Sequence, residues 1–188
     1  MELYIIITAI LAYLIGAIPT GYLIAKLNGI ADIRAHGSGN IGATNVARFL
    51  GKHYFFIIFF IDAGKAFLCM HFLQPYFDYN YLCFFAAVLL FGNGYSIFLQ
   101  GTGGKGVATL CGLLTALDPK ALIILFIPWL SSLLQTKTVG IASVCAVAYF
   151  PLYSYFCTNY YFFLLACFAT ALIVWKHRSN IRTYWNNH

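Results

Sequence analysis

The chain has 188 residues, enough for one ordinary domain, but its composition is not that of a water-soluble protein. Hydrophobic residues make up 62% of it, charged residues only 9%, and the mean hydropathy is +0.81, whereas soluble domains carry about 25% charged residues. This composition excludes a soluble enzyme, a disordered tail and a nucleic-acid-binding protein, whose basic residues would have to cluster on a hydrated face. The sequence predicts a single polytopic membrane domain over residues 1–188, with no nucleic-acid partner.

The apolar segments predict the membrane-spanning helices, since a span needs about 20 mostly apolar residues. In chain order, the candidates are residues 3–24, 54–73, 81–99, 107–117, 121–134, 139–157 and 160–175. Gly16 and Pro19 should kink the first of them. The fourth and fifth are short and are separated by Asp118-Pro119-Lys120, so they are either two short helices joined by a turn or one bent segment. The two interpretations give seven or six spans.

The basic residues favour seven spans in an all-α integral membrane protein. With the N-terminus outside, nine Lys and Arg residues fall in inner loops, Lys65 lies within a span, and only Lys120 lies outside. Cytoplasmic loops of membrane proteins are enriched in Lys and Arg. We therefore expect an outside N-terminus and a cytoplasmic C-terminus. The six cysteines lie in apolar stretches without a metal-binding spacing, so no metal site is expected.

Three polar segments fall on the predicted inner face, over residues 32–48, 101–109 and 176–182. Each combines flexible backbone or hydroxyl groups with fixed positive charge. Glycine allows consecutive N–H groups to turn toward one anion, and Lys or Arg completes the neutralisation. This combination is typical of a phosphate-binding site.

The stretches GSGNIGATNVAR, GGKGVAT and KHRSNIR, in this order and spacing, resemble the three motifs of the bacterial integral-membrane glycerol-3-phosphate acyltransferases that use acyl phosphate. The resemblance extends from Leu3 to Arg182. It implies a seven-helix fold in the bacterial cytoplasmic (inner) membrane, with the active site facing the cytoplasm. It also implies transfer of an acyl group from acyl phosphate to the sn-1 hydroxyl of glycerol 3-phosphate, giving lysophosphatidate and inorganic phosphate. The expected partners are these two substrates and membrane lipid, with no cofactor.

The resemblance assigns Ser38, Lys105, His177 and Asn180 to the catalytic site. Lys105 would bind substrate phosphate, and the simpler alternative is a lysine that only sets topology. Ser38 would hydrogen-bond a phosphate oxygen, or is a plain turn serine. His177 is the one side-chain base near neutral pH in the three motifs. It would either deprotonate the attacking hydroxyl or orient the phosphate while a phosphate oxygen takes the proton.

Further residues are candidates for binding substrate. They are Asn40, Thr44, Asn45, Arg48, Lys65, Gly103, Gly104, Gly106 and Ser143. Arg48 is either a second phosphate ligand or an interfacial arginine, and the polar residues of the first motif either bind substrate or cap the next helix. Asp62 and Lys65 lie one turn apart within a span. A structural ion pair that supports the site is the main interpretation there, and contact with glycerol 3-phosphate is the alternative.

The chain departs from the family pattern at a few positions. Asn93 and Ser96 stand where histidine and proline are expected, and Thr138 and Gly140 where tyrosine and serine are common. These changes affect the expected details of the site that binds the acyl donor more than they affect the expected reaction. The alternative function is a small phosphate-ester transporter with an inner-face anion site, although such proteins usually show repeated halves and charges in more than one span.

Overall fold

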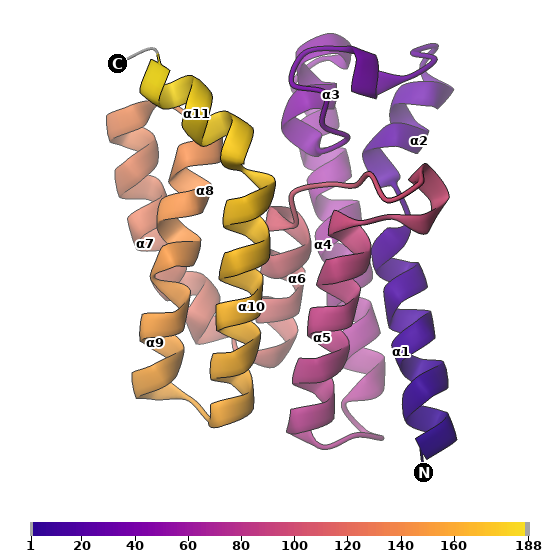
Figure 1. Ribbon diagram of the computed structural model, residues 1–188, viewed down its shortest axis with the longest axis vertical. Helices are drawn as coiled ribbons and strands as arrows, with labels where there is room; N and C mark the ends of the chain where they lie inside the picture. Colours follow the sequence, from indigo (N-terminus) through magenta and orange to yellow (C-terminus); the bar gives the residue numbers. More distant parts are fainter. Residues whose placement is uncertain (1, 187–188) are drawn as a thin grey trace.

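The computed structural model describes residues 2–186 as helices joined by short loops, without a β-strand in that range (Figure 1). The helices are α1 (Glu2–Ala17), α2 (Thr20–Leu27), α3 (Ala43–Leu50), α4 (His53–Leu73), α5 (Tyr79–Gly94), α6 (Val107–Leu117), α7 (Pro119–Thr136), α8 (Val139–Ala148), α9 (Phe150–Cys157), α10 (Tyr160–Lys176) and α11 (Arg178–Asn186). Two single 3-10 turns, η1 (Ile33–Ala35) and η2 (Ile97–Leu99), lie in the polar loops. The prediction of an all-α protein is confirmed.

Within residues 2–186, four segments are long and apolar enough to cross a membrane: His53–Leu73, Tyr79–Leu99, Pro119–Thr136 and Val139–Cys157. The bent pairs α1–α2 (40°) and α10–α11 (53°) bring this number to six if each is one span. Helix α6 is apolar but shorter, so the count of seven stays a prediction. The first bend lies at the predicted kink beside Pro19.

Asp118 separates α6 from α7, as the interpretation with two short helices requires. Its carboxylate accepts hydrogen bonds from the backbone N–H groups of Lys120 and Ala121, and Pro119 occupies the first turn of α7. A side-chain acceptor at the cap and a proline just inside the helix are both typical helix-start features. The turn residues therefore end one helix and begin the next.

Glycines allow two helix pairs to pack closely. A Cβ atom added to Gly16 of α1 would lie 2.0 Å from the carbonyl oxygen of Leu89 in α5, and one on Gly112 of α6 would lie 2.0 Å from that of Ala63 in α4. Small residues let membrane helices approach closely, and packing drives their association there. Between the helices lies a core with Phe85, Leu113 and other large apolar side chains.

The two intramembrane charges stabilise the break between α1 and α2. The Lys65 ammonium lies 2.7 Å from Asp62 and donates a hydrogen bond of 2.8 Å to the carbonyl oxygen of Ile18. The Thr20 hydroxyl donates to the same carboxylate at 2.8 Å. The break between α1 and α2 leaves the Ile18 carbonyl without a helical partner, and Lys65 supplies one while it also pairs with Asp62. This arrangement matches the main interpretation, a structural ion pair.

The polar segments gather at one end of the molecule. Figure 1 shows α3, the loop before it and α11 at the same end, while the first residues of α1 lie at the opposite end. Helices α4 and α7 leave most of their apolar residues unburied by protein. The helices therefore display an apolar surface along their length and a polar surface at one end.

Candidate active site

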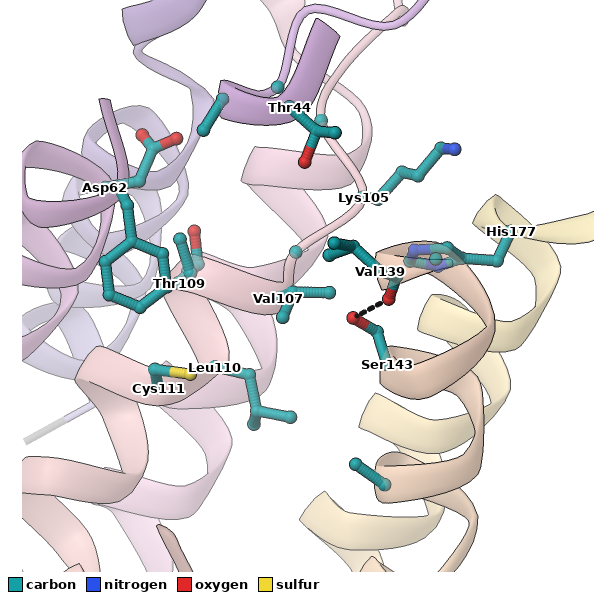
Figure 2. Close-up of a pocket in the computed structure, with 18 of the residues that line it drawn as sticks. Thr44, Asp62, Lys105, Val107, Thr109, Leu110, Cys111, Val139, Ser143 and His177 are labelled. Carbon is teal, nitrogen blue, oxygen red and sulfur yellow. Dashed lines mark hydrogen bonds between the residues drawn. The ribbon is translucent and has the colours of Figure 1, made fainter. Parts of the chain in front are cut away.

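Residues from all three polar segments line one cavity of about 550 Å³ (Figure 2). The predicted site residues that line it are Ser38, Asn40, Thr44, Asn45, Arg48, Gly104, Lys105, Gly106, Ser143, His177 and Asn180. Gly103 and Lys65 are absent from the lining. Lys65 is held by Asp62 and Ile18 instead, so the geometry favours its structural role over contact with substrate.

Asn45 organises the loop of the first motif from within. Its side-chain oxygen accepts a hydrogen bond from the Ser38 N–H at 2.9 Å, and its amide donates to the carbonyl oxygens of His36 (3.0 Å) and Asn40 (2.9 Å). Both amide protons are therefore used inside the loop, and Asn45 is only 2% exposed. The Asn40 side chain likewise accepts from the Gly42 N–H at 2.8 Å. These contacts assign Asn45 a bracing role where the sequence predicted substrate binding or helix capping.

The groups of the first motif that remain exposed at the cavity are Ser38, Thr44 and Arg48. Arg48 forms no ion pair or hydrogen bond with any residue in the range 2–186. Its guanidinium is a fixed positive charge with five donors, a geometry suited to phosphate.

The second motif rests directly on the end of α5. The Gly104 N–H donates to the carbonyl oxygen of Asn93 at 2.8 Å. A Cβ atom on Gly103 would lie 2.3 Å from that oxygen and 2.5 Å from the carbonyl oxygen of Gly94. Gly106, with φ +84°, then begins α6 in the left-handed region that glycine adopts without strain. Gly103 is thus a packing residue that positions the loop.

Lys105 projects from this loop to the third motif. Its ammonium donates a hydrogen bond to the side-chain oxygen of Asn180. Burial, together with the smaller effect of the positive charges of Arg48 and Lys176, lowers the pKa of Lys105 to about 8. Lys176 itself is turned away, because its ammonium binds the carbonyl oxygen of Gly94 at 2.6 Å and lies 4.7 Å from the centre of the Tyr95 ring. A bound anion would relieve the repulsion around Lys105.

His177 lies at the junction of α10 and α11, past the apolar part of α10, and is 3% exposed. Its Nδ1 is 2.8 Å from the carbonyl oxygen of Ile173, to which it donates, so in the neutral ring Nε2 carries the free lone pair. Burial lowers the pKa of His177 to about 4, the positive charge of Lys105 acts in the same direction, and the hydrogen bond to Ile173 opposes them. The ring is therefore neutral at pH 7, with an open lone pair on Nε2, and the lowered pKa makes it a weak base.

Helix α8 supplies the wall opposite α6. Figure 2 shows Val139 and Ser143 facing Val107 and Leu110 across the cavity, with His177 beside Val139. The Ser143 hydroxyl donates to the carbonyl oxygen of Val139 at 2.9 Å, which leaves its oxygen free to accept.

The structure shows what surrounds three of the residues that depart from the family pattern: Gly140, Asn93 and Ser96. A Cβ atom on Gly140 would lie 2.1 Å from the side-chain nitrogen of Asn180, so glycine makes the space that Asn180 occupies. Asn93 lines the cavity, and its backbone supports Gly104. The Ser96 hydroxyl, just before η2, donates to the carbonyl oxygen of Ala17 at 2.5 Å and so connects the loop between α5 and α6 to the end of α1.

Apart from Asp62, which is paired with Lys65, and Thr109, most of the remaining lining is apolar, and sequence reasoning left these apolar residues unassigned. They include Leu110, Leu114, Leu122, Leu125, Phe126, Trp129, Ala146 and Val147. The sequence did contain a pattern that could have identified some of them: Val107, Leu110 and Leu114 recur at the spacing of one face of α6. The cavity thus has a cationic mouth and an apolar interior.

Comparisons with known proteins support one family. The family model described as glycerol-3-phosphate acyltransferase matches residues 6–187. The chain belongs to the glycerol-3-phosphate acyltransferase family. Among its curated relatives, the glycerol-3-phosphate acyltransferase of Prochlorococcus marinus (strain MIT 9312) is 36% identical, with 94% of this chain and 91% of the relative covered. That of Aquifex aeolicus is 39% identical, with 92% and 91% covered.

The fold is also that of a solved family member. The crystal structure of PlsY, an integral membrane glycerol 3-phosphate acyltransferase, in its glycerol 3-phosphate form superimposes with a TM-score of 0.92 at 35% identity, over 98% of this chain and 93% of the other. Its lysophosphatidic acid form gives a TM-score of 0.89 at 34% identity, with the same coverage. The resemblance drawn from the three motifs is confirmed, and the chain is an integral membrane protein of this family.

Proposed function

We propose that this protein transfers an acyl group from acyl phosphate to the sn-1 hydroxyl of glycerol 3-phosphate. Glycerol 3-phosphate acylation is the activity of the family to which it belongs. The observation that carries the proposal is a cavity with two unlike halves, in which cations from separate motifs meet at the mouth above an apolar interior. Two phosphate-bearing substrates, one with a fatty tail, match this division of charge and apolar surface.

The basic residues hold the phosphates in this scheme. Lys105 and Arg48 bind substrate phosphate, and Ser38 and Thr44 add hydrogen bonds at the mouth. The acyl chain lies against the apolar residues of α6, α7 and α8. Asn180 orients Lys105 through their hydrogen bond. Such pre-positioned charge stabilises a transition state without needing to reorganise during the reaction.

The reaction is a direct acyl transfer. The hydroxyl oxygen of glycerol 3-phosphate attacks the acyl carbonyl carbon, the bond from that carbon to the phosphate oxygen breaks, and phosphate leaves with the electron pair. The hydroxyl proton passes to Nε2 of His177 or directly to a phosphate oxygen. Lys105 neutralises the charge that develops on the leaving phosphate. An acyl phosphate is a mixed anhydride with a good leaving group, so positioning and charge suffice.

The membrane orientation is part of the proposal. We place the N-terminus outside, seven spans with α6 as the short one, and the cavity mouth at the cytoplasmic face of the bacterial inner membrane. Support comes from the basic residues concentrated at the polar end. Single cysteines at positions 38, 105 and 180, in a background without the native ones, should react only from the cytoplasm, and one at position 78 only from outside. Labelling of 105 and 180 from opposite sides would exclude this topology.

The test of function is an assay of the purified protein in lipid. Acyl phosphate and labelled glycerol 3-phosphate should yield lysophosphatidate and phosphate in equal amounts, and acyl-CoA alone should yield none.

The variant Lys105→Ala tests the placement of the site. It removes a charge-assisted contact worth about 1.5–3 kcal/mol, or roughly 10- to 150-fold in kcat/KM. Lys105→Arg should restore activity in part.

Lys26 provides the matched control, since it is an exposed lysine of α2 that does not line the cavity. Lys26→Ala should keep normal activity. A well-folded Lys105→Ala protein with near-normal activity would exclude this placement of the site. Uptake of glycerol 3-phosphate into vesicles without product would favour the transporter.

A further inference from the structure

A second groove, of about 670 Å³, runs along the outer side of α10 and α11. Its apolar part includes the small residues Cys167, Thr170 and Ala171, which recur at the three- and four-residue spacing of one face of α10. Pro151 of α9 and Trp175 also line it. Because α10 has the composition of a membrane span, this face lies where lipid chains surround the protein.

Two arginines close the polar end of the groove. Arg178 and Arg182 are four residues apart on α11 and both line it. The Arg178 guanidinium lies 4.7 Å from the centre of the Trp175 ring and donates to the Trp175 carbonyl oxygen at 3.1 Å. Arg182 has no ion pair or hydrogen bond among residues 2–186. Two positive charges therefore meet at the end of an apolar trough.

No acidic side chain among residues 2–186 forms an ion pair with either arginine. Asp118 is the last acidic residue of the sequence, and its carboxylate binds the Tyr153 hydroxyl at 2.8 Å. Asp32 is paired with Arg34, and Asp62 with Lys65. Within the part of the chain that the structure describes, the positive charge at this end of the groove is therefore available to an anionic ligand.

The groove is separate from the acyltransferase cavity. The two share no lining residue, although they lie on either side of the same α10–α11 junction. His177 and Asn180 line the cavity, whereas Arg178, Ile181 and Arg182 line the groove. A ligand in the groove would therefore leave the cavity unobstructed.

We propose that this groove binds one anionic phospholipid of the surrounding bilayer. Its phosphate lies between Arg178 and Arg182, and an acyl chain follows the trough of small residues toward Pro151. The continuous apolar trough favours a lipid over free phosphate. The two guanidinium groups, which have no acidic partner among residues 2–186, favour an anionic lipid over a zwitterionic one. Each basic residue near an anionic membrane surface strengthens binding about fivefold, so the pair accounts for roughly 30-fold.

Native mass spectrometry of the purified protein tests this proposal without substrates, so its outcome does not depend on acyltransferase activity. The protein is titrated with phosphatidylglycerol or phosphatidylcholine, and the retained lipids are counted. One phosphatidylglycerol should be retained in preference to phosphatidylcholine. The double variant Arg178→Gln/Arg182→Gln should weaken that binding by roughly 30-fold. The matched control Lys26→Gln/Lys52→Gln removes two exposed cations that line neither cavity nor groove and should bind as the unchanged protein does.

A second pair of variants tests the apolar part. Ala171→Trp fills the trough without changing the charge and should weaken phosphatidylglycerol binding, whereas Ala148→Trp, at an exposed position of α8 outside the groove, should not. The thermal unfolding midpoint of each variant shows that it is folded. Equal retention of phosphatidylcholine, unchanged binding by the double arginine variant, an equal loss in the lysine control, or displacement of the lipid by millimolar inorganic phosphate would each overturn the proposal.

Discussion

The loops that carry the first and second motifs border the same cavity but are held by different forces. In the first loop (residues 32–42), side chains form the framework: Asn45 and Asn40 bind backbone groups, and Asp32 binds Arg34. In the second loop (residues 100–106), the backbone packs on the end of α5 with no room for a Cβ atom at Gly103. The first loop has exposed residues at the cavity mouth, and the second carries the half-buried Lys105.

This difference predicts how each loop responds to change. A framework of hydrogen bonds can lose one member and keep the rest, so damage to the first loop should be graded. Backbone packing has no flexible group that can yield, so a single added atom should displace the whole second loop. The residue whose charge matters most to the proposed reaction is thus carried by the loop with the least freedom.

The largest effect is expected from Gly103→Ala. The added methyl group would clash with two backbone oxygens, an overpacking of about 3 kcal/mol that should lower the unfolding temperature. The displaced loop would also move Lys105 from its position, and losing its charge-assisted contact with phosphate should lower kcat/KM about 100-fold. Gly101→Ala is the matched control, because its Cβ atom meets nothing within 4 Å and only its φ of +80° is unfavourable. That strain is on the order of 1 kcal/mol. Equal losses from both variants would show that the second loop is not held by packing.

The charge on Lys105 should be visible in the pH profile. Phosphate binding needs the protonated ammonium, whose pKa is lowered to about 8 from 10.5. As the pH rises through this value the charge is lost, so kcat/KM, which reports the free enzyme, should fall about tenfold per pH unit above it. Lys105→Arg stays charged and should lose this decline. A profile for the unchanged protein that is flat to pH 10 would contradict the assignment.

A smaller, graded loss is expected from Asn45→Ala in the first loop. The variant removes three hydrogen bonds that together order the backbone around Ser38. Each has a net value of about 1 kcal/mol, and partial rearrangement of the exposed loop should limit the fall in kcat/KM to about tenfold. Asn28→Ala, on an exposed asparagine that lines no part of the cavity, is the comparison. A 100-fold loss in Asn45→Ala would remove the distinction between the loops.

The smallest effect should follow Gly140→Ala, which tests the role of Asn180, the hydrogen-bond acceptor for Lys105 of the second loop. The new methyl group would push the Asn180 side chain and weaken, without abolishing, its hydrogen bond from the Lys105 ammonium. A weakening of about 1 kcal/mol corresponds to about fivefold in kcat/KM. Gly64→Ala in α4 has nothing within 4 Å of its Cβ position and should be harmless. Full activity in Gly140→Ala would show that Asn180 is dispensable for placing Lys105.

Local sequence patterns predicted the limits of α6, the three motifs and the Asp62–Lys65 pair. The predicted limits of the fourth span, residues 107–117, coincide with α6, because Gly106 and Asp118 mark its ends within the sequence itself. The three motifs were recognisable because glycines, hydroxyls and cations occur together in otherwise apolar sequence. The pairing of Asp62 with Lys65 also followed from their spacing and from the cost of unpaired charge in a membrane.

Other features depend on elements that are distant in the sequence. Gly140 could be noted only as a missing serine, since the Asn180 side chain that fills its space comes from α11. Asn45 was a candidate ligand because no local pattern shows that its amide is already used by a folded loop. The Ile18 carbonyl that holds Lys65 becomes available only through the helix break at Pro19. The groove at Arg178 likewise requires the bend between α10 and α11.

The hydrogen bond from His177 to Ile173 has a consequence for the fate of the proton. With Nδ1 committed to a carbonyl oxygen, the imidazole has one open nitrogen, so it cannot receive a proton on one side and release it on the other. In the proposed reaction, a proton taken from the glycerol 3-phosphate hydroxyl must return to the cavity through Nε2, where the departing phosphate is the acceptor. Direct transfer to a phosphate oxygen ends in the same place. By either route, the phosphate group of the acyl phosphate leaves as hydrogen phosphate and carries away the proton of the attacking hydroxyl.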